Sequence, residues 1–176
     1  MTGKISVQLL LAELANAAGI GENQVTGGQL NTLQGSKSRG YDTGHTYGKP
    51  VDCSGLLVAI ARKHYDPYYP RYTADTFNSE MGEKDIHIKD GKVDLPDIPG
   101  IFVYRPRDTN RTESQSQHVG IYTGRTYDEE KDEYDLYTIE AFDPKHGIGR
   151  RGDRLTGKTM FTRWGYLDFV DYPNRD

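Results

Sequence analysis

The chain holds one cysteine, Cys53, and a distant histidine, His118, that opens a run of β-branched and aromatic residues. A thiol attacks only as the thiolate, and a nearby imidazole can take its proton. A lone cysteine cannot form an internal disulfide, so this pairing is that of a possible thiol hydrolase. The plain alternatives are a small buried side chain for Cys53 and a hydrogen-bonded structural role for His118.

The position of Cys53 favours the chemical interpretation. Apolar residues follow it at helical spacing, and Asp52 precedes it as a candidate N-cap, which predicts a helix that begins at Cys53. A helix N-terminus carries roughly half a positive charge, which stabilises a thiolate in the first turn. His118 at a strand start is the expected partner.

Two motifs carry a family resemblance. The segments VDCSGLL at residues 51–57 and HVGIYTG at residues 118–124 resemble the signature motifs of the NlpC family of papain-like cell-wall peptidases. The resemblance covers roughly residues 40–172 and implies that Cys53 is the nucleophile and His118 the general base. Residues 163–167, with Trp164, are similar to the tail of such domains in bacteriophage lysins.

The resemblance also suggests supporting residues. Tyr41, with Gly44 three positions later, is similar to a family segment whose tyrosine stabilises the oxyanion, and its alternative is packing in a glycine-rich loop. Glu140 occupies the third catalytic position, where a carboxylate can accept the imidazole N–H. Strand alternation places Glu140 on the face opposite Ile139, and its alternative is a solvated glutamate.

The remaining candidates surround this group. Asp52 and Ser54 flank the nucleophile and, together with Tyr41 and Trp164, are expected to bind the oxyanion or the substrate. The alternative for Trp164 is the core. His45 and His146 are expected in loops at the rim. One departure from the family pattern is Pro99-Gly100-Ile101, which lacks the usual acidic residue after the glycine.

The elements predicted to position these residues are helices followed by strands. We expect helices from Ser6 as N-cap to Gly19, from Cys53, and near residues 73–81. A polar segment at residues 80–95, with turn signals at Asp90-Gly91, is expected to form a surface hairpin or a loop. Strands are expected at residues 101–104, 118–122, 134–142 and 167–172. This order predicts an α+β fold, papain-like by resemblance, with a central antiparallel sheet. We expect one domain over residues 1–176, with a catalytic core at about 40–172 and an N-terminal helix and rim at 1–39.

Composition narrows the function. With 27% charged residues and a net charge of -4, the chain lacks the basic character of nucleic-acid binders. No run of about 18 apolar residues predicts a membrane span, and the N-terminus carries no signal-peptide pattern. We expect a monomer without cofactor or metal, since no paired cysteine or histidine spacing suggests one.

The resulting expectation is a peptidoglycan hydrolase that cuts a stem peptide, most often after γ-linked D-glutamate in the family, and is released by a phage or prophage. A muramoyl-alanine amidase, an acyltransferase on the same fold and an inactive cell-wall-binding module stay open as alternatives.

Overall fold

The structure, a computed structural model, describes residues 3–20, 52–107, 117–141, 148–152, 154–156, 161–173 and 175. In these ranges the helices are α1 (Val7–Ala18), α2 (Cys53–His64) and α3 (Ala74–Met81). The strands are β1 (Ile5–Ser6), β2 (Gly82–Asp85), β3 (His87–Lys89), β4 (Lys92–Asp94), β5 (Phe102–Arg105), β6 (His118–Asp128), β7 (Glu133–Ala141), β8 (Ile148–Arg151), β9 (Arg163–Gly165) and β10 (Val170–Asp171).

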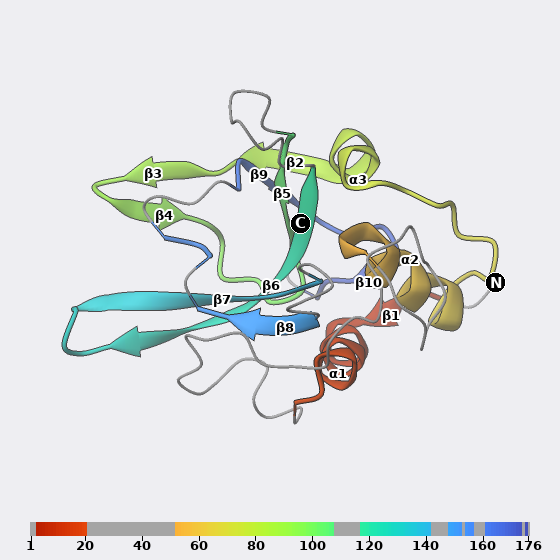
Figure 1. Cartoon of the computed structure of the whole chain (residues 1–176), viewed down its shortest axis with the longest axis horizontal. Coiled ribbons are helices and arrows are strands. Elements are labelled where there is room, and N and C mark those ends of the chain that lie inside the picture. The colour runs from red at the N-terminus through yellow and green to blue at the C-terminus, as the bar shows by residue number, and fades with distance from the viewer. Residues whose placement is uncertain are drawn as a thin grey trace.

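The central element is a six-stranded antiparallel sheet in the order β2-β9-β5-β6-β7-β8 (Figure 1). β6 and β7 are its longest strands and form a hairpin that projects beyond the other strands in the view of Figure 1. A separate hairpin joins β3 to β4, and β1 pairs in parallel with β10.

Local capping sets the helix boundaries. Ser6 accepts a hydrogen bond from the Leu9 amide at 3.1 Å and starts α1, and Gly19 ends it in the left-handed conformation at φ 72°. Thr73 accepts a hydrogen bond from the Thr76 amide and starts α3 in the same way. Each of these helix ends therefore follows from its own sequence.

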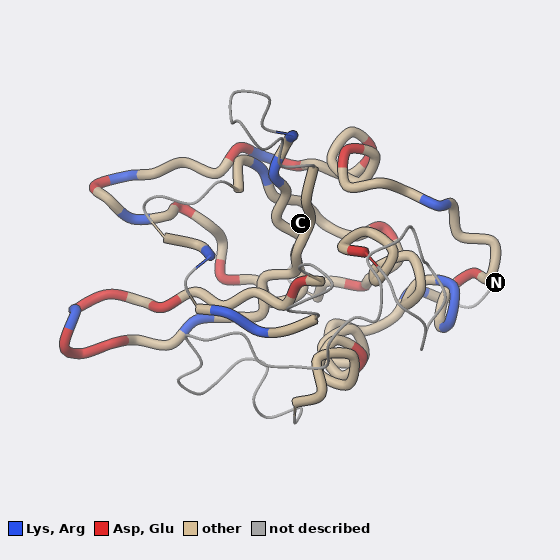
Figure 2. Tube along the Cα trace, viewed as in Figure 1, with Lys and Arg blue, Asp and Glu red and all other residues tan. Residues whose placement is uncertain are grey.

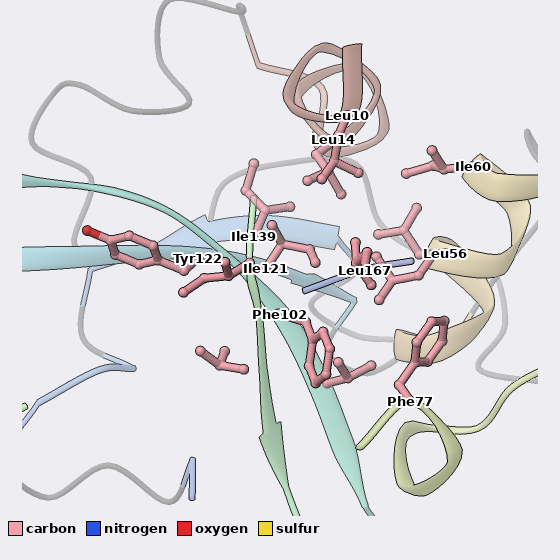
Figure 3. Packing of buried hydrophobic residues seen from close by; sticks show 14 of the residues in the cluster. Leu10, Leu14, Leu56, Ile60, Phe77, Phe102, Ile121, Tyr122, Ile139 and Leu167 are labelled. Atoms are coloured by element: carbon pink, nitrogen blue, oxygen red, sulfur yellow. The ribbon is translucent and has the colours of Figure 1, made fainter. Parts of the chain in front are cut away.

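The hydrophobic core lies between the sheet and the helices (Figure 3). Leu10 and Leu14 of α1 point toward Ile139 of β7, while α2 turns its apolar side chains toward the same interior. Phe77 of α3 packs against Phe102 of β5, with ring centroids 6.3 Å apart. The same core contains apolar residues of α2, which begins at Cys53, and of β6, which begins at His118.

The predicted α+β class is confirmed, with N-terminal helices, a central antiparallel sheet and Cys53 at a helix N-terminus. Of the hairpin or loop expected around Asp90-Gly91, the structure shows the hairpin, and both residues have positive φ as a tight turn requires. Strand β6 runs six residues further than predicted.

The strand predicted at residues 167–172 is wrong except for β10. The amide of Val170 donates to the carbonyl of Leu167, and the amide of Leu167 donates to the Tyr172 hydroxyl at 3.1 Å. These bonds turn the backbone before it can extend. The predicted strand end Phe142 lies outside the described residues.

In the described ranges, none of the helices is long and apolar enough to cross a membrane. Acidic residues gather at the tip of the β6–β7 hairpin, as the red segments of the trace in Figure 2 show. There Lys131 pairs with Asp135 at 2.7 Å and with Asp128 at 3.5 Å. The tip thus has the character of the solvated turn that its charge run suggests.

Candidate active site

The helix that carries Cys53 begins with a strong cap. Asp52 has extended backbone angles, and its Oδ1 accepts a hydrogen bond from the Gly55 amide at 2.6 Å. The Leu56 amide bonds to the Asp52 carbonyl at 3.1 Å. Cys53 is therefore the first helical residue, where the dipole of α2 favours a negative sulfur.

Arg71 braces this helix start. Its Nη2 lies 2.9 Å and 3.0 Å from the two carboxylate oxygens of Asp52, and its Nη1 donates to Ser54 Oγ at 3.1 Å. Hydrogen bonds between charged groups are stronger than those between neutral ones. The side chains of Asp52 and Ser54 are thus engaged in holding the turn that presents Cys53.

Cys53, His118 and Glu140 form a connected series. The thiol of Cys53 is hydrogen-bonded to the His118 side chain and to the backbone of Val119. His118 Nε2 lies 2.6 Å from Glu140 Oε1, which leaves the other ring nitrogen, Nδ1, for the thiol. The imidazole therefore lies between a nucleophile and a carboxylate, which is the arrangement of a catalytic triad.

Glu140 is buried, with 1% of its surface exposed, in a space left by a glycine. A Cβ atom on Gly120, two residues after His118 on β6, would lie 2.5 Å from Glu140 Cγ. On the other side Glu140 pairs in register with Gly149 of β8. Thr138, on the same strand and face, donates a hydrogen bond to Oε2.

The segment after β8 covers the His118–Glu140 pair. Phe161 stacks on the His118 ring, with centroids 6.0 Å apart and the planes 29° from parallel. Arg154 Nε lies 3.4 Å from Glu140 Oε2, and the Arg154 guanidinium lies over the Phe161 ring at 5.8 Å. These contacts shield the pair from water. Electrostatic interactions between the shielded groups are stronger than they would be in water.

The surroundings shift all three ionisation equilibria toward the charged forms. Burial acts to raise the pKa of Cys53, but the hydrogen bond and charge of His118 outweigh it and lower that pKa. Burial acts to lower the pKa of His118, yet its bonds to Cys53 and Glu140 raise it to about 9. For Glu140, burial is outweighed by His118, Arg154 and Thr138, which lower its pKa to about 2.

These shifts favour a thiolate, an imidazolium and a carboxylate in sequence, followed by the guanidinium of Arg154. The charges alternate along the series, so each buried charge has a neighbour of opposite sign. A lowered pKa makes the Cys53 thiolate, which is the nucleophilic form, easier to reach, and the imidazolium beside it is a proton donor.

Other residues singled out from the sequence lie elsewhere. Trp164 is buried in β9, packs edge-on against Tyr166 and pairs with Val103, which in turn pairs with Gly120. Two strand spacings therefore separate it from β6, and its packing fits the core alternative. Tyr41, His45 and His146 lie outside the described residues.

Four residues of the site have no sequence prediction behind them: Arg71, Gly120, Arg154 and Phe161. Gly120 is part of the HVGIYTG motif, and its strand position two residues from His118 is the signal that marks it. Arg71, Arg154 and Phe161 reach the site only through tertiary packing.

In the part of the chain that the structure describes, no group of three or more His, Cys, Asp or Glu side chains is arranged to hold a metal ion.

Comparisons with known proteins give a distant likeness to a solved structure. No family model matches the sequence, and no curated protein matches it significantly. A solved structure from Staphylococcus aureus subsp. aureus Mu50, described as similar to a lipoprotein of the NLP/P60 family, superposes with a TM-score of 0.44 at 16% identity. The match covers 96% of this chain and 45% of that protein. At this distance the likeness assigns neither a family nor an activity.

Proposed function

We propose that this chain is a cysteine hydrolase that cleaves an amide bond in the stem peptides of bacterial peptidoglycan. The observation that carries the chemistry is the buried series of Cys53, His118 and Glu140, joined by hydrogen bonds. The substrate class rests on the resemblance of the two segments around Cys53 and His118 to the motifs of cell-wall peptidases. The chain would act as a monomer on the cell wall, in the setting of a phage or prophage lysin.

The reaction follows from the site. The Cys53 thiolate attacks the carbonyl carbon of the scissile amide, and the carbonyl electron pair moves onto oxygen. The carbonyl then re-forms as the C–N bond breaks, and His118 donates its Nδ1 proton to the leaving amine. Neutral His118 next takes a proton from water, hydroxide attacks the thioester, and the Cys53 thiolate leaves.

The oxyanion would be stabilised at the start of α2. Among the first amides of this helix, those of Gly55 and Leu56 are bonded to Asp52. The amides of Cys53 and Ser54 have no acceptor within a helix of this geometry, and they point in the direction of the dipole's positive end. Donors so placed typically contribute about 2.7–4 kcal/mol each to transition-state stabilisation.

A single digestion experiment tests the proposal. Purified peptidoglycan is incubated with the wild-type protein, with Cys53→Ala and with His118→Ala, and the new amine and carboxyl ends are identified by mass spectrometry. We expect the wild type to release stem-peptide fragments and both variants to lose at least about a hundredfold in rate. Equal digestion by the wild type and Cys53→Ala would refute the thiol mechanism.

The same products separate the alternatives. A new carboxyl end on D-glutamate indicates the endopeptidase, whereas free lactyl carboxyl groups on muramic acid indicate the amidase. A product that forms only when an acceptor amine is added indicates acyl transfer. Binding of peptidoglycan by the wild type without any new ends would indicate the inactive binding module.

A further inference from the structure

Among the described residues, two cationic side chains form an ion pair with the Glu140 carboxylate. One is His118, and the other is Arg154. Its side chain is 29% exposed, whereas the Glu140 side chain is fully buried. The separation of 3.4 Å between Arg154 Nε and Glu140 Oε2 is that of an ion pair without hydrogen-bond geometry. Arg154 therefore acts on Glu140 chiefly by charge.

The two oxygens of Glu140 have different partners. Oε1 faces His118 Nε2, while Oε2 faces Thr138 Oγ1 and Arg154 Nε. Contacts at Oε2 fix the rotation of the carboxylate group, and that rotation sets the direction of Oε1. The orientation of the His118 ring thus depends on what holds the far side of Glu140.

The proposed reaction changes the charge of His118 but not that of Arg154. Once His118 has given its proton to the leaving amine, the imidazole is neutral, and the buried Glu140 carboxylate loses its nearest counter-charge. An isolated buried carboxylate is costly. A guanidinium stays protonated throughout, so Arg154 supplies a counter-charge at every stage.

Resting on the proposed function, we propose that Arg154 is a positioning residue of this site. Its guanidinium holds the Glu140 carboxylate in the orientation that aims Oε1 at His118 and compensates its charge while His118 is neutral. Phe161 supports this role because its ring lies against both the His118 ring and the Arg154 guanidinium.

Removal of Arg154 should change how the reactivity of the site depends on pH. The groups that act on Glu140 are His118 from β6, Thr138 from β7 and Arg154 after β8, and His118 is coupled to Cys53 from α2. Removal of Arg154 raises the pKa of Glu140 because one of the charges that lower it is lost. Protonation of Glu140 would then disturb His118 at a higher pH than in the wild type.

The test compares Arg154→Met, which removes the charge, with Arg154→Lys, which keeps it. Arg125→Met is the matched control, because Arg125 is also a partly buried arginine with an ion pair and a ring contact. It pairs with Asp97 at 3.3 Å and lies over the Tyr122 ring at 5.4 Å, toward the end of β6 that is away from His118. The first readout is the rate of Cys53 alkylation by iodoacetamide as a function of pH. The second is kcat and KM on peptidoglycan.

For Arg154→Met we expect kcat to fall roughly ten- to hundredfold, as for other residues that orient a functional histidine, with little change in KM. We also expect the acid limb of Cys53 alkylation to move to higher pH. Arg154→Lys should restore the acid limb and most of kcat, and Arg125→Met should match the wild type in both. A merely structural role would not distinguish methionine from lysine.

Wild-type kinetics and pH profile in Arg154→Met would overturn this inference, as would an acid limb that is the same in Arg154→Met and Arg154→Lys. If Arg154→Met does not fold, Arg154→Gln replaces it in the same comparison. Failure of the proposed function would look different: the wild-type thiol itself would react with iodoacetamide no faster than free cysteine.

Discussion

Gly120 and Glu140 face each other so closely that a Cβ atom on Gly120 would lie 2.5 Å from Glu140 Cγ and 3.2 Å from its Cδ. The strand that begins with His118 therefore has a gap two residues later, and the side chain that orients His118 fills it. Glycine is required at this position because the Glu140 side chain occupies the space of a Cβ atom. The backbone conformation of Gly120 does not require it.

Gly120→Ala should displace Glu140 and reduce activity. The added methyl group forces the glutamate side chain to move, at a cost of about 1–3 kcal/mol in the free energy of unfolding, as is usual for overpacking. Because His118 then loses its orienting partner, we expect kcat to fall more than tenfold on the scale of general-base contributions. Urea unfolding and peptidoglycan digestion measure the two effects.

Two further variants check this explanation. Gly3→Ala should be neutral, because a Cβ atom there meets no atom within 4 Å. The double variant Gly120→Ala/Glu140→Ala should regain stability without regaining activity, because the clash is gone but so is the carboxylate. Additive losses in the double variant would mean that Gly120 does not act through Glu140.

The alkaline limit of activity should lie near pH 9. The imidazolium of His118 donates the proton to the leaving amine, and its pKa is raised to about 9 from an ordinary 6.5. The raised pKa means that the proton is retained through neutral pH and is lost only as the pH rises through about 9. We expect kcat/KM to be sustained up to this point and to fall beyond it.

Glu140→Gln provides the comparison for that limit. The amide cannot stabilise the imidazolium by charge, so the alkaline limb should move to lower pH while the protein stays folded. The measurement is the pH profile of peptidoglycan digestion for both proteins. An alkaline limb at the same pH in both would show that Glu140 does not support the His118 charge.

Asp52→Asn should increase the acidity of the Cys53 thiol. The negative charge of Asp52 acts to raise the pKa of Cys53, and its removal leaves the Arg71 guanidinium nearby without that neutralising charge. Asparagine is as good an N-cap as aspartate, so α2 should stay intact. We expect alkylation of Cys53 to persist to lower pH than in the wild type.

Thr73→Ala is the matched control for this effect. It removes the N-cap of α3 and should cost about 1 kcal/mol in the free energy of unfolding. Since Thr73 makes no contact with the thiol, the pH profile of Cys53 alkylation should not change. A similar shift in Thr73→Ala and Asp52→Asn would attribute the effect to helix capping instead of charge.

Arg150→Met should stabilise the protein. The side chain is fully buried, its guanidinium nitrogens have no hydrogen-bond partner among the described residues, and it stacks on the Tyr137 ring at 3.8 Å. A desolvated cation–π contact is worth about 2 kcal/mol, whereas desolvation of a charge costs several kcal/mol. Urea unfolding should therefore show a higher midpoint, and a lower one would mean that the stacking dominates.

The local parts of this site were predictable because neighbouring residues determine them. Asp52 caps the helix that begins at Cys53 through bonds within one turn, and the alternation along β7 places Glu140 on the same face as Thr138. His118 was recognisable from its motif. What these signals specify is the position of each side chain on its own element.

The contacts between elements were not predictable in this way. Arg71 reaches Asp52 across 19 positions in the chain, and Arg154 and Phe161, which follow β8, reach Glu140 and His118 from other strands. The hydrophobic periodicity of the sequence does not predict these contacts between elements, because they depend on how the core packs. The same limit explains Trp164, where the sequence left groove and core as alternatives and the packing within β9 fits the core.

The parallel pairing of β1 with β10 brings together segments from opposite ends of the described chain, with Ile5 opposite Val170 and Ser6 opposite Asp171. Ser6 is also the cap of α1, so this helix is anchored by a strand that lies far along the chain. Contacts of such long sequence separation slow folding, because loop closure precedes any gain from them. The docking of α1 is thus expected to be a late folding step, which follows the arrival of β10 beside β1.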